Sequence, residues 1–133
     1  MISKEELSAA LGQFTGTESY LRHKPFGGRG LVLTDGARFV AEKAGAWWLM
    51  DAILSYQPQC KRDPMLRDMQ FWKLKVGEDR EAVLTCERDE GDIAITQVIP
   101  ATDFPLGEIK LWVELGSVDM ENPDYVLMLP SER

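Results

Sequence analysis

One aspartate and one histidine carry the side chains best suited to chemistry in this 133-residue chain. Asp51 is the single carboxylate in the apolar segment 44–54, where burial would raise the pKa of its side chain and suit it to proton transfer. His23 is the only histidine, and histidine is the side chain most often used as a general base. In the structural alternative, Asp51 accepts hydrogen bonds from an indole, the backbone or an arginine, and His23 lies in a surface loop. The candidate pocket therefore comprises Asp51, Trp47, Trp48 and His23, with no catalytic residue assigned.

The sequence lacks the motifs of known catalytic and metal sites. No serine or cysteine stands in a nucleophile motif, and the glycines of segment 25–30 precede an expected strand, whereas a phosphate loop places them before a helix. Cys60 and Cys86 have neither metal-ligand spacing nor a disulfide framework, and we expect reduced thiols, one in a loop and one on a strand. The acidic segments 89–92 and 119–124 lack the ligand ladder of a calcium loop. The sequence predicts no metal and no cofactor, and it favours a non-enzymatic protein without deciding the point.

Charge is distributed unevenly along the chain. Residues 1–62 carry eight Lys and Arg against six Asp and Glu, whereas residues 63–133 carry seven against sixteen, so that the net charge of −7 comes from the second half. An acidic surface repels phosphate and steers basic proteins toward itself, although it also simply keeps a protein soluble. An outward Trp112 would either anchor a partner or be covered by N-terminal segments, and the second is favoured. The candidate partner surface comprises Glu87, Asp89, Glu90, Asp92 and Trp112.

Two helices are predicted in the first half of the chain. Residues 3–12 form an amphipathic helix that begins at Ser3, because a glutamate follows three residues later, and that stops at Gly12. Residues 46–57 are apolar almost all round, which is typical of a buried central helix whose tryptophans lie in the core.

The strands are predicted from turn chemistry and from alternation. The Asp35–Gly36 pair separates two apolar runs, 31–34 and 37–41, and therefore predicts a β-hairpin. Further along, the hydrophobic period changes to two, and residues 125–129 are apolar on both faces, as in a strand covered on both sides. The expected strands of this second half are 71–76, 82–88, 92–99, 108–115 and 125–129.

Together these elements predict one α+β domain over residues 1–133: an antiparallel β-meander of five to six strands, a DG hairpin, a short N-terminal helix and a buried central helix. An apolar content of 44% and a charged content of 28% are typical of globular proteins. No apolar run approaches the ~20 residues of a membrane span, and the polar N-terminus lacks the apolar core of a secretory signal. We expect a cytoplasmic protein without a membrane partner, and the sequence does not indicate its oligomeric state.

Several phrases in fixed order resemble a family of small bacterial and mobile-element proteins known only as a domain of unknown function. The phrases are FTGT (14–17), TDG (34–36), AEKAGAWWLMDAI (41–53), ATDFPL (101–106), IKLWV (109–113) and LMLPSE (127–132). The resemblance implies a shared fold and an accessory-gene setting, and it carries no established activity. Its pattern singles out Asp35, Gly36, Gly45, Trp48, Asp51, Asp103, Phe104 and Pro105.

Three functions follow from these features. The leading hypothesis is a cytosolic, non-enzymatic accessory protein whose acidic half contacts a basic host protein, such as one that handles nucleic acid. The alternative is a small-molecule binder or small enzyme with a pocket near Asp51. The least favoured is a weak nucleic-acid binder, which would require five basic residues to cluster in space: Arg22, Lys24, Arg29, Arg38 and Lys43.

Overall fold

The computed structural model describes residues 1–119 and 121–133. Its helices are α1 (Lys4–Leu11), α2 (Asp35–Lys43), α3 (Trp47–Ser55), α4 (Gln57–Cys60) and the short 3₁₀ helix η1 (Pro130–Glu132). Its strands are β1 (Leu21–His23), β2 (Leu31–Leu33), β3 (Met69–Val76), β4 (Ala82–Asp89), β5 (Asp92–Ile99), β6 (Glu108–Gly116) and β7 (Asp124–Met128).

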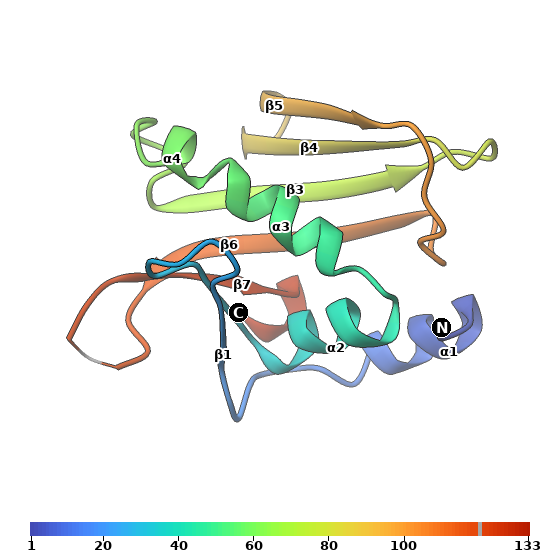
Figure 1. The fold of residues 1–133 in the computed structure, drawn as a ribbon, viewed down its shortest axis with the longest axis horizontal. Coiled ribbons are helices and arrows are strands. Elements are labelled where there is room, and N and C mark those ends of the chain that lie inside the picture. The colour runs from blue at the N-terminus through green and yellow to red at the C-terminus, as the bar shows by residue number, and fades with distance from the viewer. Residues whose placement is uncertain (120) are drawn as a thin grey trace.

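The strands form one sheet in the order β1-β2-β7-β6-β3-β4-β5 (Figure 1). Neighbouring strands run antiparallel except β2 and β7, which run parallel. The predicted α+β fold with an antiparallel sheet is confirmed, and the sheet has slightly more strands than the five to six expected. One strand that the prediction missed is β1, because its three residues are too few to show an alternating pattern.

The predicted Asp-Gly hairpin is wrong, because Asp35 and Gly36 begin helix α2. The Thr34 hydroxyl accepts a hydrogen bond from the Ala37 amide at 3.3 Å and so caps the helix. The supposed second strand, 37–41, buries Ala37, Val40 and Ala41, which is the i, i+3, i+4 spacing of a helix. Over so few residues the two periods are hard to separate, and an Asp-Gly pair suits the first turn of a helix as well as a turn between strands.

The predicted helix 46–57 is confirmed in position, but its first part ends two residues early, at Ser55. It divides at Tyr56 into α3 and α4, and Pro58 lies in the first turn of α4, where its missing amide hydrogen costs nothing. Trp47 and Trp48 are half-buried at the margin of the core, so the expectation that both lie within it is only partly met. The largest fully buried side chains are Trp72 and Phe104.

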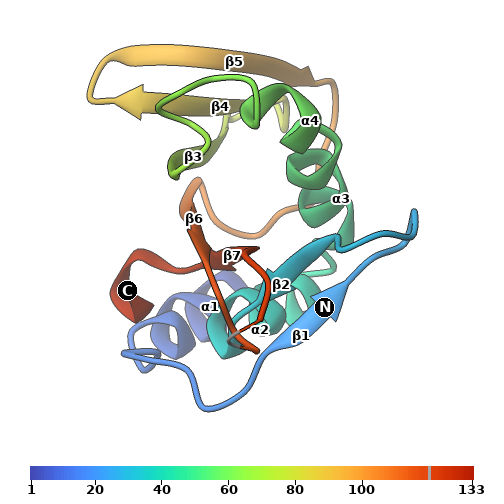
Figure 2. The same cartoon turned by 90° about the vertical axis from the view of Figure 1, so that its left-hand side faces the viewer.

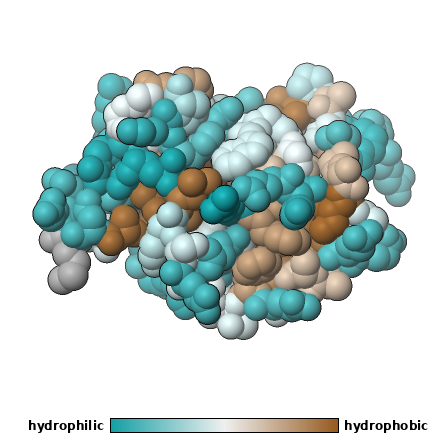
Figure 3. Space-filling model, turned by 60° about the horizontal axis from the view of Figure 1, so that its bottom comes forward, coloured by the Kyte–Doolittle hydropathy of each residue, from teal (hydrophilic) through white to brown (hydrophobic). Residues whose placement is uncertain are grey.

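The two faces of the sheet differ in what covers them. The helices pack on one face, where the inward residues of the strands and helices form one core, and the sheet curves around α3 and α4 (Figure 2). The opposite face carries a small apolar cluster of Val32, Val126 and Met128, against which Trp112 packs. On the side shown in Figure 3, apolar side chains form separate patches among hydrophilic ones. The expectation that β7 is covered on both sides is confirmed, since all five of its residues are buried.

The thiols lie next to each other inside the core. Cys86 lies on β4 as expected, whereas Cys60 lies in α4 rather than in a loop, and both are buried and free. A hydrogen bond from Cys60, together with burial, raises the pKa of the Cys86 thiol. The pair therefore packs as two small apolar side chains.

Candidate functional site

His23 and Asp51 meet in the fold, although 28 residues separate them in the sequence. β1 presents His23 to helix α3, where its Nε2 lies 2.7 Å from Oδ1 of Asp51. The His23 ring also packs against Trp47 at a centroid distance of 5.0 Å. The Asp51 side chain is 42% exposed and the His23 side chain 15% exposed. The histidine is therefore not the surface-loop residue of the structural alternative, and Asp51 is not the deeply buried carboxylate of the chemical one.

This pair lacks the third member that nucleophilic catalysis needs. Among the described residues no hydroxyl or thiol hydrogen-bonds to His23, and the nearby Ser55 donates its hydroxyl to the Ala52 carbonyl at 2.6 Å. Trp48 lines a different depression, together with Ile99 and residues 101–103. The structure thus brings three members of the candidate pocket together and leaves Trp48 apart.

The candidate partner surface forms a groove on the face of the sheet opposite the helices. Phe71 on β3 and Trp112 on β6 are direct neighbours in the sheet register, and their rings meet edge to face at a centroid distance of 5.3 Å. Because Trp72 points into the core, the alternation of β3 turns Phe71 to the opposite face. The groove has a volume of about 410 Å³, and Phe71, Trp72, Lys73, Glu87, Asp89, Glu90, Lys110 and Trp112 line it.

The carboxylates of this groove have no cationic partner. Among the described residues, Glu87, Asp89 and Glu90 form no ion pair; Glu87 accepts the Gly91 amide at 3.0 Å and Asp89 accepts the Glu90 amide at 2.8 Å. Asp92 differs, because it does not line the groove and pairs with Arg88 at 3.0 Å. Four of the five predicted surface residues therefore converge.

Irregular pairing between β4 and β5 shapes this end of the groove. The register shifts between Cys86 and Glu87 and again between Glu87 and Asp89. Such bulges change the direction in which a strand presents its side chains. The N-terminal helix and the 13–30 segment do not line the groove, whereas Thr17 and Tyr20 of that segment line a neighbouring depression with Val126 and Met128. Phe71, Lys73 and Lys110 complete the surface and follow from the same alternation.

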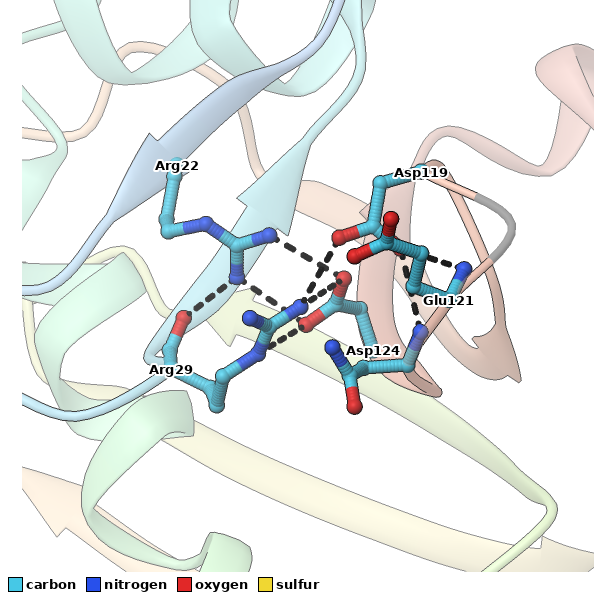
Figure 4. A network of polar contacts seen from close by, with 6 residues as sticks. Arg22, Arg29, Asp119, Glu121 and Asp124 are labelled. Atoms are coloured by element: carbon cyan, nitrogen blue, oxygen red, sulfur yellow. Dashed lines mark hydrogen bonds and ion pairs between the residues drawn. The ribbon is translucent and has the colours of Figure 1, made fainter.

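Two arginines converge on one buried aspartate, the first residue of β7 (Figure 4). Asp124 accepts two hydrogen bonds from Arg22 and two from Arg29, at 2.9–3.1 Å. The hydrogen bond from Arg22 contributes most to holding the pKa of Asp124 at about 2, followed by that from Arg29, while burial opposes both. Asp119 adds a weaker contact to Arg29 at 3.4 Å.

The basic residues of the first half therefore do not form a single free patch. Arg22 and Arg29 are engaged by Asp124, and Arg38 pairs with Glu42 on the surface of α2 at 2.8 Å.

The described residues contain no group of three or more His, Cys, Asp or Glu arranged to hold a metal ion. Within the described parts of the chain, no helix has the length and apolar character needed to cross a membrane.

The fold and its surfaces define an α+β domain with one face of its curved sheet left open around an aromatic groove. The chain belongs to a family of unknown function, DUF6876, whose model matches residues 5–133. No curated protein and no solved structure matches it. The resemblance found in the sequence is thereby confirmed at the level of a family whose function is not known.

Proposed function

We propose that this protein is a non-enzymatic binding protein that takes a basic segment of a partner protein into the groove around Phe71 and Trp112. The observation that carries the proposal is a set of three carboxylates, Glu87, Asp89 and Glu90, which form no ion pair within the described part of the chain and lie beside an edge-to-face aromatic pair. A lysine or arginine of the partner could stack on the Trp112 indole while its charge meets these carboxylates. A cation over an indole contributes about 0.5–2 kcal/mol, depending on its desolvation.

The charges around the groove favour basic partners at longer range as well. The half of the chain that supplies every groove residue carries the excess of acidic side chains. Such a field raises the rate of encounter with basic proteins and lowers it with polyanions. Lys73 makes only a long contact with Glu108, at 3.9 Å, and Lys110 lines the groove as well. The three carboxylates of the lining therefore outnumber its two lysines and leave a net charge of −1 for a basic partner.

We further propose that the protein acts in the cytoplasm as an accessory protein, encoded in a mobile element or another accessory-gene setting. Two adjacent buried thiols that remain free suit a reducing compartment. A basic protein that handles nucleic acid is the kind of host partner whose chemistry matches the groove.

A defined basic probe tests the groove directly. We expect wild-type protein to bind a fluorescent nona-arginine peptide at about 150 mM salt, and we expect the E87Q/D89N/E90Q variant to weaken this binding at least about tenfold. The matched control, E5Q/E18Q/E78Q, removes the same charge from exposed glutamates outside the groove and should bind as wild type does. Equal losses in both variants would reduce the effect to net charge and overturn the proposal.

Capture from lysate then identifies the partner. Wild type and the control should retain the same basic protein, whereas the groove variant and a Trp112→Leu variant should lose it. Retention by all four proteins would place the partner on another surface.

A second candidate function rests on the His23–Asp51 pair. A ligand with a hydrogen-bonding group could reach His23 beside Trp47, and its binding would depend on the 2.7 Å contact. Ligand screening with wild type against Asp51→Asn tests it, and hits that bind both proteins equally would dismiss the pair as a binding site.

A further inference from the structure

A second cavity shares no lining residue with the aromatic groove. Its volume is about 750 Å³, within the range of small-molecule sites. The loop between β1 and β2, the end of α3 with the start of α4, and the facing ends of β6 and β7 enclose it. Its apolar wall comprises Phe26, Leu54, Pro58, Leu115, Pro123 and Tyr125.

The charges in this cavity are mainly positive, although the chain as a whole is acidic. Arg29, Lys61 and Arg67 line it, and among the described residues Lys61 and Arg67 form no ion pair. The Lys61 ammonium instead lies 5.8 Å from the centre of the Tyr125 ring. Two cations that form no ion pair with the described carboxylates thus lie beside an apolar wall.

The carboxylate that lines the cavity does not cancel these charges. Asp124 already accepts four hydrogen bonds from Arg22 and Arg29, and its side chain is only 1% exposed (Figure 4). Arg29 uses Nε and Nη2 for Asp124 and Asp119, and its Nη1 has no hydrogen-bond partner among the described residues. Asp63, between α4 and β3, is engaged by Arg88 at 2.7 Å. The positive potential of Lys61 and Arg67 therefore remains available to a ligand.

The loop between β1 and β2 holds an aromatic ring at the cavity. Phe26 is 73% exposed, although it belongs to the lining. Gly27, Gly28 and Gly30 adopt left-handed φ angles of 80°, 69° and 62°. A Cβ on Gly30 would collide with the His23 carbonyl, so the close approach of the loop to β1 requires glycine there. The backbone conformation of this loop therefore depends on its glycines. The loop presents the Phe26 ring at the cavity with most of its surface exposed.

We propose that this cavity binds a small organic anion with a planar apolar body. The body lies against Phe26 and Tyr125, and a carboxylate or phosphate group meets Lys61 and Arg67, assisted by the guanidinium of Arg29. Arginine and lysine are the side chains that recognise such groups by charge-assisted hydrogen bonds. This site is independent of the proposed protein-binding groove, so that either can fail without the other.

Phenyl phosphate is a suitable probe, with amide NMR spectra of the labelled protein as the readout. We expect saturable shifts at Gly27, Gly30 and Tyr125, and at least about tenfold weaker binding of inorganic phosphate and of benzyl alcohol, each of which supplies half of the chemistry. Benzoate serves as the carboxylate counterpart: tighter binding of benzoate assigns a carboxylate ligand, and tighter binding of phenyl phosphate assigns a phosphate ligand.

The variant K61Q/R67Q should weaken phenyl phosphate binding at least about tenfold and leave the fold intact, because both side chains are exposed. The control K4Q/K75Q removes the same charge outside the cavity and should bind as wild type does. The proposal is overturned if neither phenyl phosphate nor benzoate causes shifts at the cavity, if inorganic phosphate binds as well as phenyl phosphate does, or if both variants behave alike.

Discussion

Replacing Asp124 by asparagine removes the one negative charge on which Arg22 and Arg29 converge. The Asp124 side chain is 1% exposed and accepts four hydrogen bonds, so that salt should screen the interaction little. Its pKa of about 2, against an ordinary value of 3.8, corresponds to about 2 kcal/mol of folding free energy at neutral pH, since one pKa unit is worth about 1.4 kcal/mol. We expect Asp124→Asn to lower the free energy of unfolding by about this amount.

The pH dependence of this loss has a definite sign. Because the pKa of Asp124 is lower in the folded state, its contribution is present in full above the unfolded value and disappears as the pH falls toward about 2. By pH ~3 about 1 kcal/mol of it should be gone. The difference in stability between wild type and Asp124→Asn should therefore shrink by about 1 kcal/mol between pH ~6 and pH ~3.

Urea unfolding followed by tryptophan fluorescence at several pH values measures this difference. Asp68→Asn is the matched control, because Asp68 is exposed and forms no ion pair among the described residues. Its stability should follow that of wild type throughout. A difference between wild type and Asp124→Asn that stays constant with pH would refute the assignment of a strongly lowered pKa to Asp124.

Three further perturbations test other parts of the fold. Gln70→Ala should cost about 2–4 kcal/mol in urea unfolding, because the buried Gln70 amide exchanges hydrogen bonds with Gln57 and accepts the Trp72 indole N–H at 2.9 Å; a loss under 1 kcal/mol would contradict this network. Thr34→Val should lower the unfolding free energy by about 1 kcal/mol or more and Thr34→Ser should not, since only the hydroxyl caps α2. Cys86, with a raised pKa inside the core, should react with a thiol reagent at neutral pH only as fast as the protein unfolds; rapid reaction of the native protein would show that the thiol is accessible.

The elements that the sequence predicts well are those in which one periodicity extends over many residues. The strands from Met69 to Gly116 alternate for eight or nine residues each, and their predicted bounds differ from the observed ones by at most two residues. The structure of segment 31–41 was predicted wrongly because its stabilising contact comes from far along the sequence. The Glu132 carboxylate accepts hydrogen bonds from the Thr34 hydroxyl and the Gly36 amide, across 98 and 96 residues. Local sequence carries no sign of such a partner.

The residues of the candidate sites were likewise predictable only where they lie on regularly alternating strands. Alternation alone turns Trp112 outward and places it with the acidic end of β4, because neighbouring strands share one face. The sequence allowed His23 and Asp51 to be named as candidates by their residue types. Whether they touch depends on how β1 packs against α3, which the sequence does not show. Lys61 and Arg67 come from the connection between α4 and β3 and Tyr125 from β7, and only the folded chain shows that they line one cavity. A site formed by side chains of adjacent, regularly alternating strands can therefore be predicted from a sequence. A site formed by residues of several connections cannot.

The position of β7 sets an order of events for folding. β7 lies between β2 and β6, and β2 pairs only with β1 and β7 among the described strands. Strands β3, β4 and β5 can pair with one another as soon as they have been synthesised, whereas β1 and β2 must wait about ninety residues for the strand that joins them to the sheet. Until Asp124–Met128 inserts and Glu132 reaches Thr34, the apolar residues of β2 and α2 have no sheet to cover them. During synthesis the strands of the N-terminal half therefore have only each other as partners, and partly folded states of this kind expose apolar surface to aggregation and to chaperones.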